Sequence, residues 1–169
     1  MADFPLPGDA GFEKMVEKVA ARLKSRGWKL ATAESCTGGW IAKCCTDLAG
    51  SSAWFERGFV TYSNPAKIEL LGVDPAVLTD KDRGAVSRET ALQMARGACH
   101  RAAVDVALAV TGVAGPDGGT DDKPVGTVWL AWSLGSNAQA ELKQFSGDRD
   151  AVRRQTVTHA LQGLLDRIA

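Results

Sequence analysis

Histidine, net charge and long apolar runs are all scarce in this chain, and each absence excludes a class of protein. The 169 residues include two histidines, and the four cysteines show no C-x-x-C spacing, so the usual ligand set of a zinc site is missing. Lys plus Arg and Asp plus Glu are 20 each, which leaves no net field to attract nucleic acid or an anionic membrane. No run approaches the ~20 apolar residues of a membrane span. We therefore expect no metal, no other cofactor, no nucleic-acid partner and no membrane contact.

The length and the cysteine usage indicate the size class and the compartment. A chain of this length is typical of one domain, here residues 1–169, which buries about two thirds of its surface without disulfides. Residues 1–8 have neither the basic segment nor the apolar segment of an export signal. Four thiols without a pairing pattern fit a reducing environment best. We expect a cytoplasmic protein.

Hydrophobic spacing predicts alternating helices and strands. Apolar residues three and four apart predict a first helix that begins near Phe12 and ends near Gly27. A Gly-Ser-Asn break at 135–137 separates two strand patterns and predicts a hairpin, so part of the sheet is antiparallel. The pattern favours an α/β protein, a three-layer α/β/α sandwich with a mixed sheet of about five strands. The predicted helices span 12–27, 38–48, 65–71, 75–82, 88–102 and 148–168, and the predicted strands span 28–33, 54–62, 105–110, 125–134 and 140–145.

Ser35 lies where a strand is expected to turn into a helix. Small residues at 35–39 separate the strand over 28–33 from the helix that follows. The first N–H groups of a helix lack partners within it, so this corner aims backbone donors at whatever sits beside the Ser35 hydroxyl. Such donors suit an oxyanion or a phosphate. The plainer alternative is that Ser35 only caps the helix.

Four unusual segments follow the ends of predicted strands. Ser35 follows the first strand and residues 62–67 follow the second. Residues 111–119, with four glycines in nine positions, follow the third strand, and residues 147–149 follow the hairpin. Because ligands of open α/β sheets bind outside the carboxyl ends of the strands, we expect these segments to meet in one cleft. The glycines would allow close backbone approach to a ligand, or would serve only a tight turn.

A serine nucleophile needs a base, and a lysine is the best candidate here. Both histidines fall in the middle of predicted helices, which gives a Ser-His-Asp arrangement little support. Lys67 directly follows an Asn-Pro turn, and partial burial would lower the pKa of its ammonium group and leave a neutral amine near Ser35. Tyr62 could relay or donate a proton to the same oxygen. The alternative for Lys67 is an ordinary solvated side chain.

Five ordered segments, which together cover nearly the whole chain, resemble the CinA C-terminal domain family. They are ESCTGG at 34–39, TYSNPAK at 61–67, VTGVAGPDGG at 110–119, KPVGT at 123–127 and FSGDR at 145–149. The chain also lacks the N-terminal molybdopterin-binding-like domain of full-length CinA proteins, so it resembles the stand-alone members, which are nicotinamide-nucleotide amidases.

The resemblance implies a reaction and roles for particular residues. The reaction is hydrolysis of the carboxamide of nicotinamide mononucleotide, a small-molecule substrate, to nicotinate mononucleotide and ammonia in pyridine-nucleotide salvage. By this analogy Ser35 is the nucleophile, Lys67 is the base, and Tyr62, Thr111 and Arg149 assist. The residues themselves add that backbone donors at 36–38 would hold an oxyanion and that Arg149 would hold a phosphate or ribose. The expected substrate-binding residues are Thr37, Gly38, Gly39, Thr111, Gly112, Gly115 and Arg149.

Other interpretations remain open at this point. The same loops could hold a nucleotide without hydrolysing it, as a binding or regulatory module, or the chain could be an amidase for another substrate. Arg149 could simply pair with Asp148 or Asp150 at the surface. The tryptophans are expected in the core or at a subunit contact, or one of them against the pyridinium ring. Exposed tryptophans and edge strands would make the protein a homo-oligomer.

Overall fold

The computed structural model describes residues 8–169. The expectation that residues 1–8 carry no export signal therefore lies almost entirely outside the described residues. Within residues 8–169, no helix combines the length and the apolar character that crossing a membrane requires.

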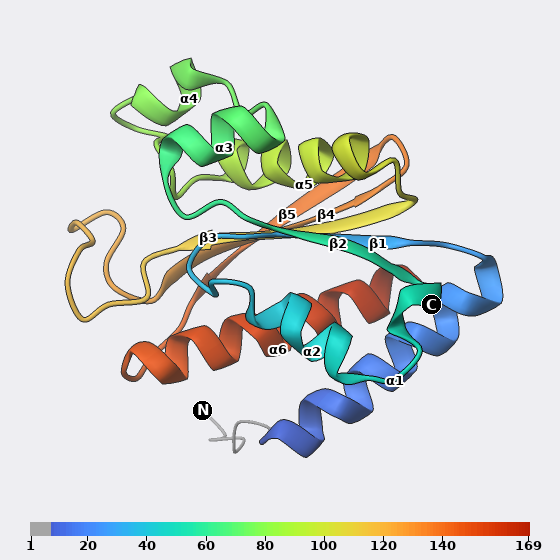
Figure 1. Ribbon diagram of the computed structural model, residues 1–169. Coiled ribbons are helices and arrows are strands. Elements are labelled where there is room, and N and C mark those ends of the chain that lie inside the picture. Colours follow the sequence, from blue (N-terminus) through green and yellow to red (C-terminus); the bar gives the residue numbers. More distant parts are fainter. Residues whose placement is uncertain (1–7) are drawn as a thin grey trace.

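A five-stranded mixed sheet forms the middle layer of the described part, in the order β2-β1-β3-β4-β5 (Figure 1). β1 pairs in parallel with β2 and β3, whereas β4 is antiparallel to both β3 and β5. β5 thus runs in the same direction as β3, and the carboxyl ends of β1, β2, β3 and β5 meet at one edge of the sheet. The strands are β1 (Leu30–Glu34), β2 (Phe55–Val60), β3 (Val106–Gly112), β4 (Thr127–Leu134) and β5 (Asn137–Gln144).

Helices cover both faces of this sheet, which confirms the predicted three-layer sandwich. Figure 1 shows α1, α2 and α6 on one face and α3, α4 and α5 on the other. Every residue of β1 is buried, as expected of a central strand covered on both sides. The helices are α1 (Asp9–Arg26), α2 (Trp40–Asp47), α3 (Asn64–Leu71), α4 (Pro75–Thr79), α5 (Arg88–Ala102) and α6 (Arg149–Arg167), with a short 3₁₀ turn, η1 (Ser51–Ala53).

Two apolar cores hold the layers together. One combines the apolar faces of α1, α2 and α6 with β1, β3 and β4 and includes Leu23, Leu108 and Leu164, none of which is exposed. The other packs α5 against the opposite face through small residues such as Ala91, Ala95 and Ala98, so the helix lies close to the strands.

The observed boundaries differ from the predicted ones at a few places. The first strand is Leu30–Glu34 rather than 28–33, and α4 ends at Thr79 rather than near Asp82. β5 begins at Asn137 rather than Ala140, because the hairpin turn needs only two residues, 135 and 136. β3 extends to Gly112, so Thr111 and Gly112 belong to the strand and not to the glycine-rich loop.

None of the five tryptophans is exposed, so the expectation of exposed tryptophans is wrong. Trp54 and Trp132 are 1 % exposed, and the other three, at positions 28, 40 and 129, are half-buried. Trp132 donates its indole N–H to the Ala160 carbonyl at 3.0 Å and packs so closely on Gly163 that an added Cβ would lie 2.2 Å from its ring. The edge strands β2 and β5 are present, and a homo-oligomer stays a prediction.

Candidate active site

The four predicted segments meet at the carboxyl edge of the sheet. There a cleft of about 250 Å³ opens between the ends of β1, β2 and β3 and the start of α6. Ser35 comes from the end of β1, Lys67 from α3, Thr111 from the end of β3 and Arg149 from the first turn of α6. The convergence expected from the strand order is therefore confirmed. The lining residues are Ser35, Cys36, Tyr62, Asn64, Lys67, Ala85, Val86, Thr111, Gly112, Ala114 and Arg149.

Ser35 and Lys67 are in direct contact at the buried end of this cleft. The Lys67 Nζ donates to Ser35 Oγ at 3.1 Å and to the Thr61 carbonyl at 2.8 Å. Ser35 is 8 % exposed and Lys67 is 2 % exposed, so bulk water surrounds neither group. The alternative of a solvated lysine is wrong for this residue.

Local sequence places the lysine where it is. The Ser63 hydroxyl caps α3 by accepting from the Ala66 N–H, and Pro65 fits the first turn of the helix. This short helix turns Lys67 inward, and burial lowers the pKa of its ammonium group, against a small opposing effect of the Cys36 thiol. Both hydrogen-bond acceptors of the ammonium are uncharged oxygens. Compared with a solvated lysine, Lys67 is therefore shifted toward the neutral amine expected from the sequence.

Cys36 does not compete with Ser35 as a nucleophile. Its side chain is 5 % exposed, and burial, together with the negative charge of Glu34, raises the pKa of the Cys36 thiol to about 12. A thiol that stays protonated is a poor nucleophile. All four cysteines are free and buried.

Glu34 holds the turn after β1, a role that sequence reasoning missed. Its carboxylate is fully buried and accepts from the backbone N–H of Ile41 at 2.9 Å, from that of Ala42 at 3.0 Å and from the Thr37 hydroxyl at 2.6 Å. A carboxylate is well suited to this place, because the N-terminus of a helix carries partial positive charge. The N-cap position of α2 is Gly39, so the interpretation of Ser35 as a helix cap is wrong.

The expectation that the first donors of this helix are free is therefore wrong as well. Two of them bind Glu34, and the Trp40 N–H donates to the Thr37 carbonyl. The Gly38 N–H, one of the expected oxyanion donors, closes the turn onto the Ser35 carbonyl at 3.0 Å. Within residues 8–169, the Thr37 N–H has no acceptor, and the Cys36 N–H faces only its own thiol. These two donors remain available beside Ser35.

Thr37, Gly38 and Gly39 do not line the cleft that contains Ser35. They line a separate hollow of about 550 Å³ on the other side of the turn, together with Arg153, which we call the outer hollow. The outer hollow is further lined by Asp9, Trp40, Lys43, Asp150 and Arg154. A substrate contact of the three turn residues stays a prediction, and in the cleft it could involve only their backbone.

Arg149 and Tyr62 form the rim of the cleft. The Arg149 guanidinium donates to the Gly115 carbonyl at 2.8 Å and to the Tyr62 hydroxyl at 3.1 Å. Its partners are therefore not Asp148 or Asp150, as the surface-cluster alternative required. Tyr62 is 62 % exposed, and its hydroxyl contacts Arg149 rather than Ser35 or Lys67. Its role as a proton donor stays a prediction.

Thr111 and the nearby glycines are tied to neighbouring backbone. The Thr111 hydroxyl donates to the Ala85 carbonyl at 2.8 Å, so it joins β3 to the loop before α5. A Cβ on Gly112 would lie 2.6 Å from the Val128 side chain, and one on Gly115, which has a φ of +80°, would lie 2.5 Å from Val125. Packing against the next segment explains both glycines without a ligand.

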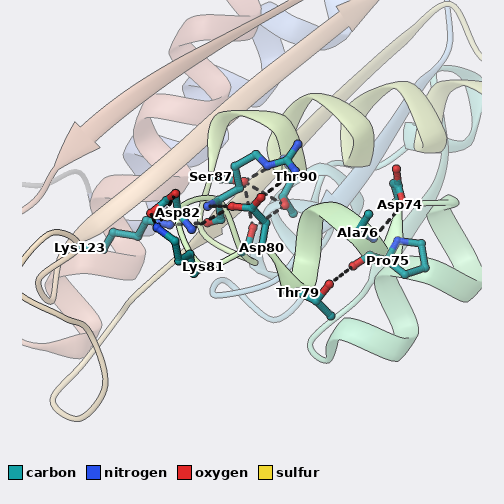
Figure 2. A network of polar contacts seen from close by, with 12 residues as sticks. Asp74, Pro75, Ala76, Thr79, Asp80, Lys81, Asp82, Ser87, Thr90 and Lys123 are labelled. Atoms are coloured by element: carbon teal, nitrogen blue, oxygen red, sulfur yellow. Dashed lines mark hydrogen bonds and ion pairs between the residues drawn. The ribbon is translucent and has the colours of Figure 1, made fainter.

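The loop before α5 forms one wall of the cleft and is stiffened by polar contacts (Figure 2). The Asp80 carboxylate accepts from two backbone N–H groups and from the Arg83 side chain, which lowers the pKa of Asp80 to about 2. Ser87 caps α5, and Lys123 donates to the Arg83 carbonyl. The segment at 123–127 thus fixes the loop that presents Ala85 to Thr111.

Arg153, one turn after Arg149, is the second residue that sequence reasoning missed. Its Nε donates to the Cys36 carbonyl at 3.1 Å and its Nη2 to the Thr37 carbonyl at 3.0 Å. The two contacts span 117 and 116 positions of the chain, respectively, so no local sequence pattern could predict them. Neither histidine lines the cleft, and residues 8–169 contain no group of His, Cys, Asp or Glu side chains that could hold a metal ion.

Comparisons with known proteins agree with this geometry. The model of the CinA C-terminal domain matches residues 12–168. The nicotinamide-nucleotide amidohydrolase PncC of Escherichia coli (strain K12) is 52% identical over 157 residues, which cover 92% of this chain and 94% of that protein. The protein of the same name from Pseudomonas putida is 54% identical over 151 residues, 89% of this chain and 93% of that protein. The crystal structure of the competence/damage inducible protein CihA from Agrobacterium tumefaciens is similar with a TM-score of 0.89 and 45% identity, and covers 96% of this chain and 98% of that chain.

The Glu34 contacts predict a large effect of one substitution on stability. Glu34→Gln replaces an acceptor oxygen by an NH₂ group that must face a backbone or hydroxyl donor. Leaving a buried donor unsatisfied costs about 1–3 kcal/mol, so we expect the free energy of unfolding to fall by that amount. Urea denaturation followed by circular dichroism measures it. Glu13→Gln, at an exposed position of α1, is the matched control and should change the value by less than about 0.5 kcal/mol. Equal stability of the two variants would contradict the role of Glu34.

Proposed function

The chain belongs to the CinA C-terminal domain family, and from this membership we propose that it hydrolyses the carboxamide of nicotinamide mononucleotide, giving nicotinate mononucleotide and ammonia. That the chain is an amidase, and the choice of substrate, are supported by the names of relatives such as the Escherichia coli and Pseudomonas putida proteins. The proposed chemistry rests on one observation, the 3.1 Å contact between the Lys67 amine and the Ser35 hydroxyl in a buried cleft.

The first half of the reaction forms an acyl-enzyme. The neutral Lys67 amine takes the proton of the Ser35 hydroxyl while Oγ attacks the carboxamide carbon. The carbonyl oxygen becomes an oxyanion, and we assign the N–H groups of Cys36 and Thr37, which donate to no backbone carbonyl within residues 8–169, to hold it. The C–N bond then breaks, the protonated Lys67 returns its proton to the leaving nitrogen, and ammonia departs.

The second half regenerates the enzyme. A water molecule gives a proton to Lys67 and attacks the ester carbon, and the same donors hold the second oxyanion. Breaking of the ester bond returns the proton to Ser35 Oγ and releases the nicotinate product. One buried amine therefore serves as base and acid in turn, and the fixed carbonyl of Thr61 keeps it in place at 2.8 Å.

The rim would hold the rest of the substrate. Arg149 carries a permanent positive charge at the mouth of the cleft. Its guanidinium group donates to the Gly115 carbonyl and to the Tyr62 hydroxyl, and both acceptors are uncharged. A phosphate offers a stronger, charge-assisted partner for the same planar fork. We assign Arg149 to the substrate phosphate, with the Tyr62 hydroxyl beside it.

The decisive experiment is ammonia release from nicotinamide mononucleotide by the parent protein, Ser35→Ala and Lys67→Met. We expect both variants to lose at least about a thousandfold in kcat, because losing the nucleophile or its base removes the covalent route. Lys67→Arg should be equally inactive, since a guanidinium stays protonated. Circular dichroism confirms that the variants fold.

The outcomes of this experiment separate the alternative functions. Binding of nicotinamide mononucleotide in a thermal-shift assay without ammonia release from the parent protein would identify a binding module and reject the proposal. Turnover of other amides in preference to this nucleotide would identify an amidase of different specificity. Retained activity in Ser35→Ala would reject the mechanism while leaving the reaction in place.

The pH dependence tests the protonation state of Lys67. The mechanism needs the neutral amine, so kcat/KM should rise with pH in a single step whose midpoint is the lowered Lys67 pKa, below the ordinary value of 10.5. At a pH between the lowered pKa of Lys67 in the folded protein and its ordinary value in the unfolded chain, Lys67 is protonated only in the unfolded chain. The free energy of unfolding should therefore rise with pH in this window. Lys67→Met should abolish that part of the stability change. A midpoint at 10.5 or above would contradict the assignment.

The role of Arg149 is tested by comparing substrates with and without a phosphate. Arg149→Met should raise KM for nicotinamide mononucleotide by about 10- to 100-fold, the worth of one or two charge-assisted hydrogen bonds. The KM for nicotinamide riboside, which has no phosphate, should change by less than about threefold. Arg96→Met, at an exposed position of α5, is the control for loss of a positive charge. Equal effects on the two substrates would reject Arg149 as the phosphate ligand.

A further inference from the structure

We propose that Arg153 is a positioning residue for the amidase reaction, which polarises the two oxyanion donors from behind the turn without touching the substrate. The inference rests on the proposed function, because it takes Ser35 as the nucleophile. It assigns a purpose to a cation that lies outside the cleft and lines the outer hollow.

Arg153 binds the turn through both arms of its guanidinium group. The Nε donates to the Cys36 carbonyl at 3.1 Å and the Nη2 to the Thr37 carbonyl at 3.0 Å. The guanidinium also lies 5.4 Å from the centre of the Trp40 ring, which restrains its plane. The Arg153 guanidinium group therefore holds two successive peptide groups of the turn.

Each of these peptide groups leads to an N–H group that donates to no backbone carbonyl within residues 8–169. The Cys36 carbonyl belongs to the same peptide group as the Thr37 N–H, which has no acceptor within residues 8–169. The Thr37 carbonyl belongs to the same peptide group as the Gly38 N–H. The Gly38 N–H donates to the Ser35 carbonyl, and the Ser35 carbonyl belongs to the same peptide group as the Cys36 N–H. Two hydrogen-bonded chains thus run from one guanidinium to the two donors beside Ser35.

A positive charge at the carbonyl end of such a chain strengthens the donor at its other end. Hydrogen bonds in series polarise one another, and the effect is larger in a site shielded from water. The peptide planes are also held in the orientation that points the N–H groups away from Arg153. Both effects favour an oxyanion more than a neutral carbonyl, and so act on the transition state.

The charge of Arg153 is not cancelled by a neighbouring acid. Asp9 and Asp150 line the same hollow, but both lie within 4 Å of Arg154, at 3.8 and 3.6 Å. No carboxylate within residues 8–169 forms an ion pair with Arg153. Its position follows from helix geometry, since Arg149 and Arg153 are four residues apart on α6 and reach the cleft and the back of the turn respectively.

The test compares Arg153→Met, Arg153→Lys and Lys43→Met in ammonia release from nicotinamide mononucleotide. Removing a whole oxyanion donor costs roughly 10²–10³ in kcat, so loss of its polarisation should cost about 10- to 100-fold, with KM changed less than about threefold. Arg153→Lys should recover only part of kcat, because an ammonium keeps the positive charge but lacks the planar fork of a guanidinium that fits both carbonyls. Lys43→Met removes another cation from the outer hollow and should stay within about twofold of the parent protein.

A second measurement does not depend on turnover. 3-Pyridylboronic acid accepts Ser35 Oγ at boron and forms a tetrahedral anion, which ¹¹B nuclear magnetic resonance detects. Arg153→Met should weaken this adduct at least about tenfold, and Lys43→Met should not. If the parent protein releases no ammonia but shows this pattern, the proposed function fails, whereas polarisation by Arg153 of the donors beside Ser35 stands.

The remaining outcomes overturn the role of Arg153. Unchanged kcat and unchanged adduct in a folded Arg153→Met protein would do so while leaving the proposed function intact. A loss seen only in KM, or an equal loss in Lys43→Met, would indicate a general charge effect in place of polarised donors. A parent protein with neither turnover nor adduct would reject both proposals.

Discussion

A buried lysine amine in contact with a serine hydroxyl is the interaction on which the rest of this site depends. An ammonium group is costly to bury, and Lys67 meets only the uncharged oxygens of Ser35 and Thr61. Within residues 8–169 no carboxylate forms an ion pair with it to stabilise its charged form. A lysine in contact with bulk water would be protonated at neutral pH and could not accept a proton from the serine. The depth of the cleft and the direction of α3 therefore lower the pKa of Lys67, which is what its proposed role as a base requires.

The turn that carries Ser35 is held by opposite charges on opposite kinds of backbone group. Glu34 accepts from the N–H groups at the start of α2, and Arg153 donates to the carbonyls of Cys36 and Thr37. Within residues 8–169, the N–H groups of Cys36 and Thr37, next to Ser35 in the chain, donate to no backbone carbonyl. The sequence predicted a helix start whose first N–H groups are all free. In the structure, Glu34 and Arg153 bind backbone groups of this turn and determine which N–H groups remain without a partner.

Much of this arrangement could be predicted from the sequence, and the parts that could not share one cause. Periodicity and cap residues such as Gly27 and Ser87 placed the helices, because these signals are local. The rule for strand ends brought Ser35, Lys67 and Arg149 to one edge without any knowledge of distances. The roles of Glu34 and Arg153 depend on tertiary contacts, that is, on which backbone groups each side chain reaches once the chain is folded. No pattern along the chain records that.

The glycine-rich segment after β3 shows why the substrate must be selected at the rim. From the sequence its glycines suggested close backbone approach to a ligand, but Gly115, like Gly112 at the end of β3, is explained by the close approach of a valine side chain, Val125 and Val128 respectively. Under the proposed function, the buried end of the cleft supplies a nucleophile, a base and two N–H donors, and this set suits any carboxamide. Discrimination between amides then falls to the exposed mouth, where Arg149 is bound only to uncharged oxygens. Under the proposed function, the substrate phosphate displaces these weaker partners of Arg149, so the phosphate is the group by which the cleft would distinguish one carboxamide from another.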